Sequence, residues 1–350
     1  MINSHLEIYK GKKVLVTGNR GFKGSWLSLW LKELQADILG FSLGPPSQPN
    51  MFETLNLGEK ITSAYGDIGD KDYKDALDFR FENFKPEIVF HLAAQPIMRK
   101  SIKEPVLTFS TNLMGTVNVL EASRNCPSVK TVVAITSDKC YKDNPKPNGY
   151  SETDRLGGDD PYSTSKACAE HAINAYRKSY GLNVASCRAG NILGGGDWGE
   201  DRLLPDCITK LSYGQKITIR NPLHLRPWQF VLDPLYGYLL LGSKLLEDKK
   251  YAQAWNFGPL IENYINVEEL VRKTIKYWGS GEYEIVPNPE ISESQFLRLN
   301  CEKSNNLLGW KPKYNINETL EKTISWYKNF YDKKDMYEFS LNQIKEYMES

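Results

Sequence analysis

The chain has 350 residues, of which 41% are hydrophobic and 25% are charged, close to ordinary globular usage. Such a composition excludes long disordered or collagen-like segments, and the length suits one large domain or two moderate ones. Lys and Arg number 44 against 43 Asp and Glu, so a net charge of +1 excludes a chain-wide field that would attract nucleic acid or an anionic membrane. Any anionic partner must be bound by local groups.

Signals for export, membrane insertion and metal binding are missing from the sequence. No apolar run approaches the roughly 18 residues of a spanning helix, and the N-terminal segment MINSHLEIYKGKK lacks the apolar core of a secretory signal. The six cysteines form no CxxC pair and the four histidines form no HExxH motif. We therefore expect a cytoplasmic protein with reduced thiols and no metal ion.

The first half of the chain alternates short β-branched runs with longer amphipathic stretches, a pattern typical of βαβ units and a parallel sheet. The predicted strands cover residues 12–17, 37–42, 61–65, 88–92, 131–136 and 183–188. The predicted helices of this half cover residues 26–34, 112–124 and 161–178. We expect an α/β fold with a Rossmann-type, doubly wound parallel sheet.

After Arg188 the regular alternation ends, and the segments NILGGGDWGEDRLLPD and RNPLHLRPWQF are dense in Gly, Pro, Arg and Trp. This composition indicates binding loops. Further helices are predicted over residues 234–246, 267–278 and 299–311 and from residue 317 onward. We expect residues 1–190 to form an NAD(P)-binding domain and residues 191–350 mainly a smaller substrate-binding lobe, with an approximate boundary.

A glycine-rich loop follows the first predicted strand. Gly18, Gly21 and Gly24 form a GxxGxxG pattern between KKVLVT and a predicted helix, where backbone N–H groups can bind a pyrophosphate. The second strand ends at Ser42 without the acidic residue that binds the adenine ribose of NAD, which leaves NAD and NADP as alternatives. Arg20 suits a 2′-phosphate, or it is a solvent-facing side chain.

Two later segments are also predicted to contact the dinucleotide. Asp67 and Ile68 follow the third strand, in a position to touch the adenine, and HLAAQ ends the fourth strand with small residues that let the cofactor approach the backbone. Together with the glycine loop and Ser42, the expected cofactor contacts are Phe22, Asp67, Ile68, Leu92, Ala93, Ala94 and Gln95.

The candidate catalytic residues lie at two strand and helix ends. Tyr162 and Lys166 form YxxxK, which places the phenol and the ammonium one turn apart on a helix. We expect this ammonium to lower the pKa of the phenol from about 10 toward the range of a general base. Ser137, Asp138 and Lys139 follow the fifth strand at the carboxyl edge of the sheet, where ligands bind in such folds. A solvated turn or an ion pair is the alternative for the last two.

Beyond these patterns, the sequence resembles the extended short-chain dehydrogenase/reductase family over nearly its whole length. The segments that carry the resemblance are VTGNRGFKGSWLSLWL, HLAAQPIMRKS, TNLMGTVNVLEA, ITSDKCY, DPYSTSKACAE, RAGNILGGGDWGEDRLLPD, IRNPLHLRPWQFVLDPLYGYLLL and AWNFGP. Within the family, Ser-Asp-Lys after the fifth strand and the GGGDW and RPWQ segments are similar to the dehydratases that act on CDP-sugars.

The resemblance implies an NAD-dependent 4,6-dehydration of CDP-glucose for deoxysugar synthesis of the lipopolysaccharide O-antigen type, by a homodimer or homotetramer. Tyr162, supported by Lys166, Ser137 and Asn112, would take the proton of the C4 hydroxyl while a hydride passes from C4 to the nicotinamide. Asp138 and Lys139 would act as acid and base in the elimination. The expected substrate contacts are Gln95, Arg99, Ser137, Asn191, Arg202, Leu203, Arg220, Arg226, Trp228 and Gln229.

Two other functions remain open at this point. A nucleotide-sugar 4-epimerase or reductase on the same scaffold would use Tyr162 and Lys166 without needing an acid and a base at residues 138 and 139. A non-catalytic NAD-binding regulator would explain the glycine loop but not the catalytic residues.

Overall fold

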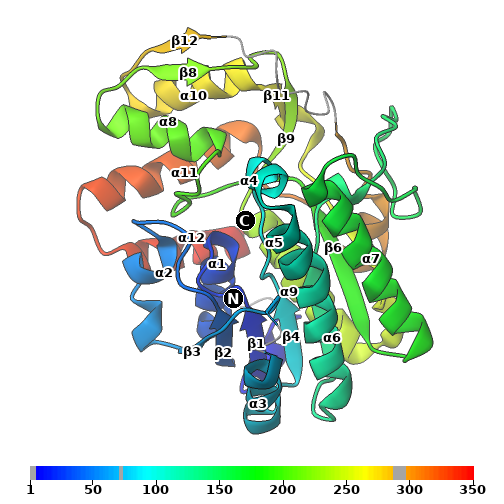
Figure 1. Cartoon of the computed structure of the whole chain (residues 1–350). Coiled ribbons are helices and arrows are strands. Elements are labelled where there is room, and N and C mark those ends of the chain that lie inside the picture. The colour runs from blue at the N-terminus through cyan, green and yellow to red at the C-terminus, as the bar shows by residue number, and fades with distance from the viewer. Residues whose placement is uncertain (1–4, 71–73, 287–296) are drawn as a thin grey trace.

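The computed structural model describes residues 5–70, 74–286 and 297–350, and its centre is a twisted parallel sheet (Figure 1). In the described part this sheet has seven strands in the order β10-β6-β5-β4-β1-β2-β3. Its strands are β1 (Lys13–Thr17), β2 (Asp37–Ser42), β3 (Thr62–Tyr65), β4 (Ile88–His91), β5 (Thr131–Ile135), β6 (Val184–Ala189) and β10 (Ala254–Phe257). The order reverses between β1 and β4, so the expected doubly wound Rossmann-type sheet is confirmed.

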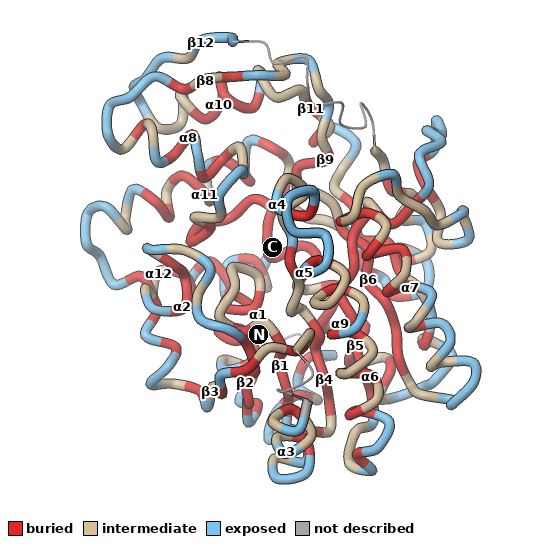
Figure 2. Tube along the Cα trace, viewed as in Figure 1, coloured by how far each residue is buried: buried red, intermediate tan, exposed pale blue. Residues whose placement is uncertain are grey.

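Helices cover both faces of this sheet, and for that reason its strands are nearly continuous apolar runs. Val14 and Val16 of β1 pack into one core cluster, whereas Leu15 packs into the cluster on the opposite face. The helices from the first half of the chain are α1 (Phe22–Glu33), α2 (Met51–Thr54), α3 (Lys74–Phe84), α4 (Met98–Lys103), α5 (Pro105–Phe109), α6 (Gly115–Asn125) and α7 (Pro161–Ser179). Figure 2 shows the buried residues concentrated along the sheet and the inner sides of these helices.

The second half of the chain contributes to the main sheet and also forms two small sheets. The small sheets are β11-β9-β7 and β12-β8. Their strands are β7 (Asn191–Leu193), β8 (Ile217–Ile219), β9 (Leu225–Phe230), β11 (Tyr264–Asn266) and β12 (Tyr283–Ile285). The helices of this half are α8 (Leu203–Ser212), α9 (Leu232–Glu247), α10 (Val267–Trp278), α11 (Ile316–Tyr331) and α12 (Met336–Glu349). Because β10 joins the main sheet and α9 packs against β5 and β6, the chain after residue 190 is interleaved with the part before it.

The structure departs from the sequence prediction at one strand of the main sheet and at one helix. Strand β10 was not predicted, because AWNF is short and contains no β-branched residue. The predicted helix over 299–311 is wrong except for a π-helical turn at Ser304–Leu308. Leu299 instead pairs with Tyr150 as extended backbone, and Gly309 ends the turn with a φ of +70°. Among the described helices, none is long and apolar enough to cross a membrane.

A buried carboxyl group fastens the C-terminal helices to the sheet domain. Asp233, in the first turn of α9, accepts hydrogen bonds at Oδ1 from the Lys313 backbone N–H at 2.8 Å and from the Tyr347 hydroxyl at 2.9 Å. Its Oδ2 atom has no partner among the described residues. Burial raises the pKa of Asp233 to about 7, although these hydrogen bonds favour the ionised form.

We predict that Asp233→Asn becomes more stable relative to wild type as the pH rises. The folded-state pKa of Asp233 lies above the unfolded value of about 3.9, so wild type loses stability as the pH rises between these values, whereas asparagine retains the Oδ1 acceptor and does not ionise. The difference in free energy of unfolding should grow by on the order of 1–4 kcal/mol between about pH 4 and about pH 8. Urea unfolding measures it, with exposed Asp332→Asn as the control; a difference independent of pH would refute the assignment.

Candidate active site

The glycine loop between β1 and α1 approaches the end of β4 too closely for any side chain. A Cβ on Gly18 would lie 2.7 Å from the Ala93 nitrogen, and Gly18 has a φ of +74°. A Cβ on Gly24 would lie 2.1 Å from the Gly18 carbonyl oxygen. Thr17 fixes the opposite wall, because its hydroxyl accepts from the Ala93 backbone N–H at 3.2 Å. The loop and the Leu92–Ala94 backbone thus form a narrow cradle at the carboxyl edge of the sheet, as the sequence predicts.

The predicted adenosine-side residues lie next to β2 and β3. The Arg20 guanidinium donates to the Ser63 carbonyl oxygen at 3.4 Å and lies over the Phe52 ring. The Ser42 hydroxyl donates to the Leu43 carbonyl oxygen at 2.9 Å. Arg20 is therefore held by neutral groups at the edge of the cradle.

Asp67 and Ile68 support the next turn of the chain. The Asp67 carboxylate accepts from the Gly69 backbone N–H at 2.8 Å. Ile68 is buried, and its carbonyl oxygen accepts from the Asn118 side chain at 2.7 Å. The Asp67 carboxylate therefore shapes a turn, and the Ile68 side chain is buried beside it.

Asn112 lies in a π-helical turn, Ser110–Met114, between α5 and α6. Its side chain accepts from the Gln95 backbone N–H at 2.8 Å and donates to the Gln95 carbonyl oxygen at 3.0 Å and to the Ser165 hydroxyl at 2.9 Å. Turns of this kind often occur at functional sites because they redirect one side chain out of the helical register. Asn112 thereby links the end of β4 to the helix that carries Tyr162. The Gln95 side chain donates hydrogen bonds to the Ile97 carbonyl oxygen and the Thr108 hydroxyl, and it accepts one from the Ile97 backbone N–H.

The catalytic candidates meet where β5 ends and α7 begins. Asp160 caps α7 by accepting from the backbone N–H groups of Tyr162 and Ser163, which positions Tyr162 in the first turn. The Ser137 hydroxyl donates to the Asp138 carboxylate at 3.1 Å and also forms a hydrogen bond with the Tyr162 phenol. One serine hydroxyl therefore lies between the proposed base and the proposed acid.

Burial controls the protonation of these groups. It raises the pKa of the Tyr162 phenol to about 12, although the hydrogen bond to Ser137 favours the phenolate. It lowers the pKa of Lys166 to about 7, with a further contribution from the nearby Lys23 ammonium. The expectation that Lys166 lowers the pKa of the phenol is therefore wrong for the protein chain alone, because desolvation disfavours both charged forms. Burial also raises the pKa of Asp138. The positive charge of Lys139 lowers this pKa, but its effect is smaller than that of burial.

Two residues near the site were missed in the sequence, Lys23 and Glu170. Lys23 is in the first turn of α1 and lies within electrostatic reach of Arg202, Asp138 and Asp197; burial lowers its pKa to about 8. A lysine at a helix N-terminus is unfavourable, because its charge opposes the helix dipole. This placement could have indicated from the sequence that Lys23 has a functional role. Glu170, one turn after Lys166, forms a buried ion pair with Arg188 at 2.7 Å. Nothing in the local sequence pairs these two residues, which are brought together by the sheet.

Two of the predicted arginines lie at the loop before α8. Arg202 forms an ion pair with Asp197 at 2.8 Å and lies within electrostatic reach of the Tyr162 phenol. Arg99, on α4, forms an ion pair with Asp201 at 2.7 Å, which joins α4 to this loop. Arg202 is therefore close to Tyr162, and both arginines are already paired with one carboxylate.

The remaining predicted substrate residues divide into two groups. Asn191, Leu203, Arg220 and Arg226 are partly or fully exposed, and Arg226 lies within electrostatic reach of Asp138. Trp228 and Gln229 are buried instead, and their side chains donate to the carbonyl oxygens of Ile265 at 3.2 Å and Phe257 at 3.1 Å. We therefore assign Trp228 and Gln229 to packing beneath the cleft. No group of three or more His, Cys, Asp or Glu residues in the described ranges is arranged to hold a metal ion.

A Rossmann sheet with a glycine cradle and a Tyr-Lys pair on α7 defines an extended short-chain dehydrogenase/reductase. The family model described as GDP-mannose 4,6 dehydratase matches residues 15–323, so the chain belongs to this family. CDP-glucose 4,6-dehydratase of Salmonella typhimurium is 43% identical over 351 residues, which cover 97% of each chain.

Solved structures with the same fold include enzymes of two activities. UDP-glucose 4-epimerase of Thermus thermophilus, in complex with NAD, is 26% identical with a TM-score of 0.78, covering 90% of this chain and 99% of the epimerase. dTDP-glucose 4,6-dehydratase of Bacillus anthracis, also in complex with NAD, has a TM-score of 0.78 at 24% identity, covering 93% and 100% of the two chains.

We predict that Gly24→Ala impairs dinucleotide binding, because the added methyl would lie 2.1 Å from the Gly18 carbonyl oxygen and would push the loop out of shape. Overpacking of this kind costs about 1–3 kcal/mol, so NAD affinity should fall by about 5- to 150-fold. Fluorescence titration with NAD measures the change. Gly44→Ala is the matched control, because nothing lies within 4 Å of the added methyl. Equal NAD affinity in the two variants would contradict the cradle.

Proposed function

We propose that this protein converts CDP-glucose to CDP-4-keto-6-deoxyglucose and water, with NAD as a cofactor that is regenerated in each turnover. The observation that carries the proposal is the position of Ser137, Asp138 and Lys139 beside Tyr162, in a chain 43% identical to a CDP-glucose 4,6-dehydratase over 97% of its length. An epimerase needs the Tyr-Lys pair but has no step that calls for an additional acid and base.

The cradle suits a dinucleotide such as NAD. The glycines let the backbone approach a pyrophosphate, and the N-terminus of α1 offers free N–H groups to its negative charge. When bound, NAD accepts a hydride from C4 and returns it to C6, and its positively charged nicotinamide favours loss of the Tyr162 proton. Arg20, already held by Ser63 and Phe52, is not needed for a second phosphate.

Tyr162 is the base for oxidation at C4. Its phenol accepts the proton of the C4 hydroxyl, and Ser137 donates a hydrogen bond to the same oxygen. Lys166 lies one turn further along α7, and because burial lowers its pKa to about 7, only its protonated fraction supplies a positive charge that favours the phenolate. Asn112 keeps α7 in place relative to the end of β4 through Ser165 and Gln95.

Asp138 and Lys139 complete the elimination. The ketone at C4 acidifies C5, and the C5 proton is taken by Lys139 in its neutral amine form or by a water that Lys139 orients. Asp138, whose pKa burial raises, is protonated more readily than an exposed aspartate and donates its proton to the departing C6 hydroxyl, which leaves as water. Reduction at C6 and return of a proton to C5 then give the product, with the cofactor as it began.

The nucleotide end of the substrate requires cations, which the loops of the second part supply. Arg202, Arg220 and Arg226 come from three different segments around the cleft, and guanidinium groups bind phosphate oxygens in a bidentate manner. Asn191, at the start of β7, adds a neutral contact. The ion pair between Arg99 and Asp201 joins α4 to the loop before α8.

We also propose that the protein works as a homodimer or a larger homo-oligomer in the cytoplasm. The helices around α6 and α7 are the expected contact, and the neighbouring surface exposes Ile102, Val106 and Met114, the second of these at 81%. The six cysteines are free, which suits a reducing compartment.

We predict that purified protein with catalytic NAD converts CDP-glucose to a product lighter by one water. Hydride leaves and returns within one site, so reduced cofactor should not accumulate in proportion to product. Mass spectrometry of the product together with nicotinamide absorbance measures both quantities. UDP-glucose and dTDP-glucose serve as matched substrates. An isomeric product of unchanged mass would instead establish a 4-epimerase.

We predict further that the two half-reactions separate by mutation. Asp138→Asn keeps the side-chain shape but removes the ionisable acid, so loss of the C6 hydroxyl should slow by about 10²- to 10⁴-fold. Hydride transfer should survive in this variant and appear as a transient change of nicotinamide absorbance on mixing. Tyr162→Phe should abolish that transient, because oxidation loses its base. Equal loss of the transient in both folded, NAD-loaded variants would contradict these roles.

A further inference from the structure

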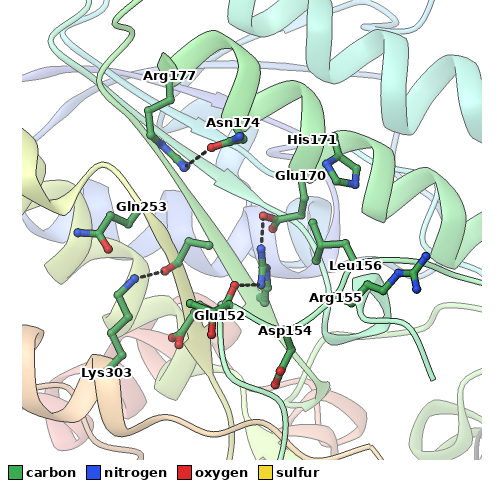
Figure 3. A pocket seen from close by; sticks show the side chains of 13 residues that line it. Glu152, Asp154, Arg155, Leu156, Glu170, His171, Asn174, Arg177, Gln253 and Lys303 are labelled. Atoms are coloured by element: carbon green, nitrogen blue, oxygen red, sulfur yellow. Dashed lines mark hydrogen bonds and ion pairs between the residues drawn. The ribbon is translucent and has the colours of Figure 1, made fainter. Parts of the chain in front are cut away.

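A cavity lined by several charged side chains lies between α7, β10 and the segment around Glu152 (Figure 3). Its volume is about 690 Å³, within the usual range of small-molecule sites. The charged side chains that line it are Glu152, Asp154, Arg155, Glu170, Arg177, Arg188 and Lys303. None of the candidate catalytic or cofactor-binding residues lines this cavity. Its four cations and three carboxylates come from segments far apart in the sequence.

The carboxylates of this cavity are already bound to other groups of the protein. Glu152 accepts from the Asn256 backbone N–H at 2.8 Å, and Asp154 accepts from the Ser151 backbone N–H at 2.8 Å and is paired with Lys146, outside the cavity. Glu170 accepts from Arg188 at 2.7 Å, from the Ser186 hydroxyl at 2.8 Å and from the Thr136 hydroxyl at 2.5 Å.

The cations, in contrast, are held mostly by neutral groups. Lys303 donates to the Ala254 carbonyl oxygen at 2.8 Å, and Arg177 donates to the Val184 carbonyl oxygen at 2.9 Å and to the Asn174 side chain at 3.5 Å. Arg155 is exposed at the rim. The Arg188 side chain is only 3% exposed, and its Nε atom has no hydrogen-bond partner among the described residues. The cavity therefore carries positive charge that the protein does not fully neutralise.

The floor of the cavity is bonded directly to the catalytic segment. Thr136, which donates to Glu170, precedes Ser137. Arg188 donates to the Tyr141 hydroxyl at 2.8 Å, two residues after Lys139. Both ends of the segment that carries Ser137, Asp138 and Lys139 are thus fastened to the Arg188–Glu170 pair, which forms part of the cavity wall.

We propose that this cavity is a regulatory site for a phosphate-bearing small molecule, of the class of sugar phosphates and nucleotides. A phosphate offers several charged acceptor oxygens, which matches guanidinium and ammonium groups that converge from separate elements. An anion at this position competes with Glu170 for Arg188 and so changes the support of the catalytic segment. The binding claim is independent of the proposed function, whereas its effect on turnover rests on it.

The test uses inorganic pyrophosphate as the probe and protein saturated with NAD and CDP, so that the cleft is occupied. Isothermal titration calorimetry should show one pyrophosphate bound per chain. Arg177→Gln and Arg155→Gln should each weaken this binding at least about fivefold, the effect of losing one charge-assisted contact. Arg272→Gln, an exposed arginine on α10 away from the cavity, is the matched control and should bind as wild type does. Because Arg155 is exposed, its variant tests the site without disturbing the core.

The same variants test the effect on turnover. At saturating CDP-glucose, pyrophosphate should change kcat of wild type and of Arg272→Gln. In Arg155→Gln, the pyrophosphate concentration that gives half of this change should be at least about fivefold higher. Wild type that binds no pyrophosphate with the cleft filled, or pocket variants that bind it as wild type does, would overturn the site. Binding with an unchanged kcat would overturn the coupling. Failure of CDP itself to bind in a separate titration would count against the proposed function instead.

Discussion

The buried ion pair between Arg188 and Glu170 is the interaction on which the arrangement of the site depends. Both side chains are 3% exposed, and the pair joins β6 to α7 at the point where β5 ends. Removing one partner of such a pair costs about 3–5 kcal/mol, because the other charge is left desolvated. Glu170 holds Thr136 and Arg188 holds Tyr141, so the pair fixes both ends of the segment between them. The segment that carries Ser137, Asp138 and Lys139 is therefore positioned by a buried charge pair.

Burial shifts the pKa values of the basic and the acidic groups of the site in opposite directions, because it disfavours the charged form of each. It disfavours the charged forms of Lys23 and Lys166, and it favours the protonated forms of Tyr162 and Asp138. For Asp138 the result suits a general acid directly. For Tyr162 burial favours the neutral phenol, and the Ser137 side chain partly offsets this effect.

Much of the sheet domain could be predicted from the sequence, because its strands are buried on both faces and its glycine loop has a fixed position after β1. The Tyr162, Lys166 and Ser137 cluster could be predicted for the same reason, since carboxyl ends of parallel strands meet at one edge. Strand β10 and the Arg188–Glu170 pair could not, because both depend on contacts between distant segments. Trp228 and Gln229 were predicted to contact the nucleotide, but they lie in β9, whose last four residues are all buried. Local composition indicated a binding loop and could not indicate which of its side chains point inward.

The central claim is that one site removes a hydride from C4 and delivers the same hydride to C6. The most direct measurement follows deuterium from CDP-glucose that carries deuterium at C4 and carbon-13 throughout its glucose, mixed with an equal amount of unlabelled substrate, by NMR and mass spectrometry of the product. The account predicts deuterium at C6 only in the product molecules that contain carbon-13, and none released to water. Deuterium lost to solvent, or remaining at C4 in a product that has kept its C6 hydroxyl, would contradict it.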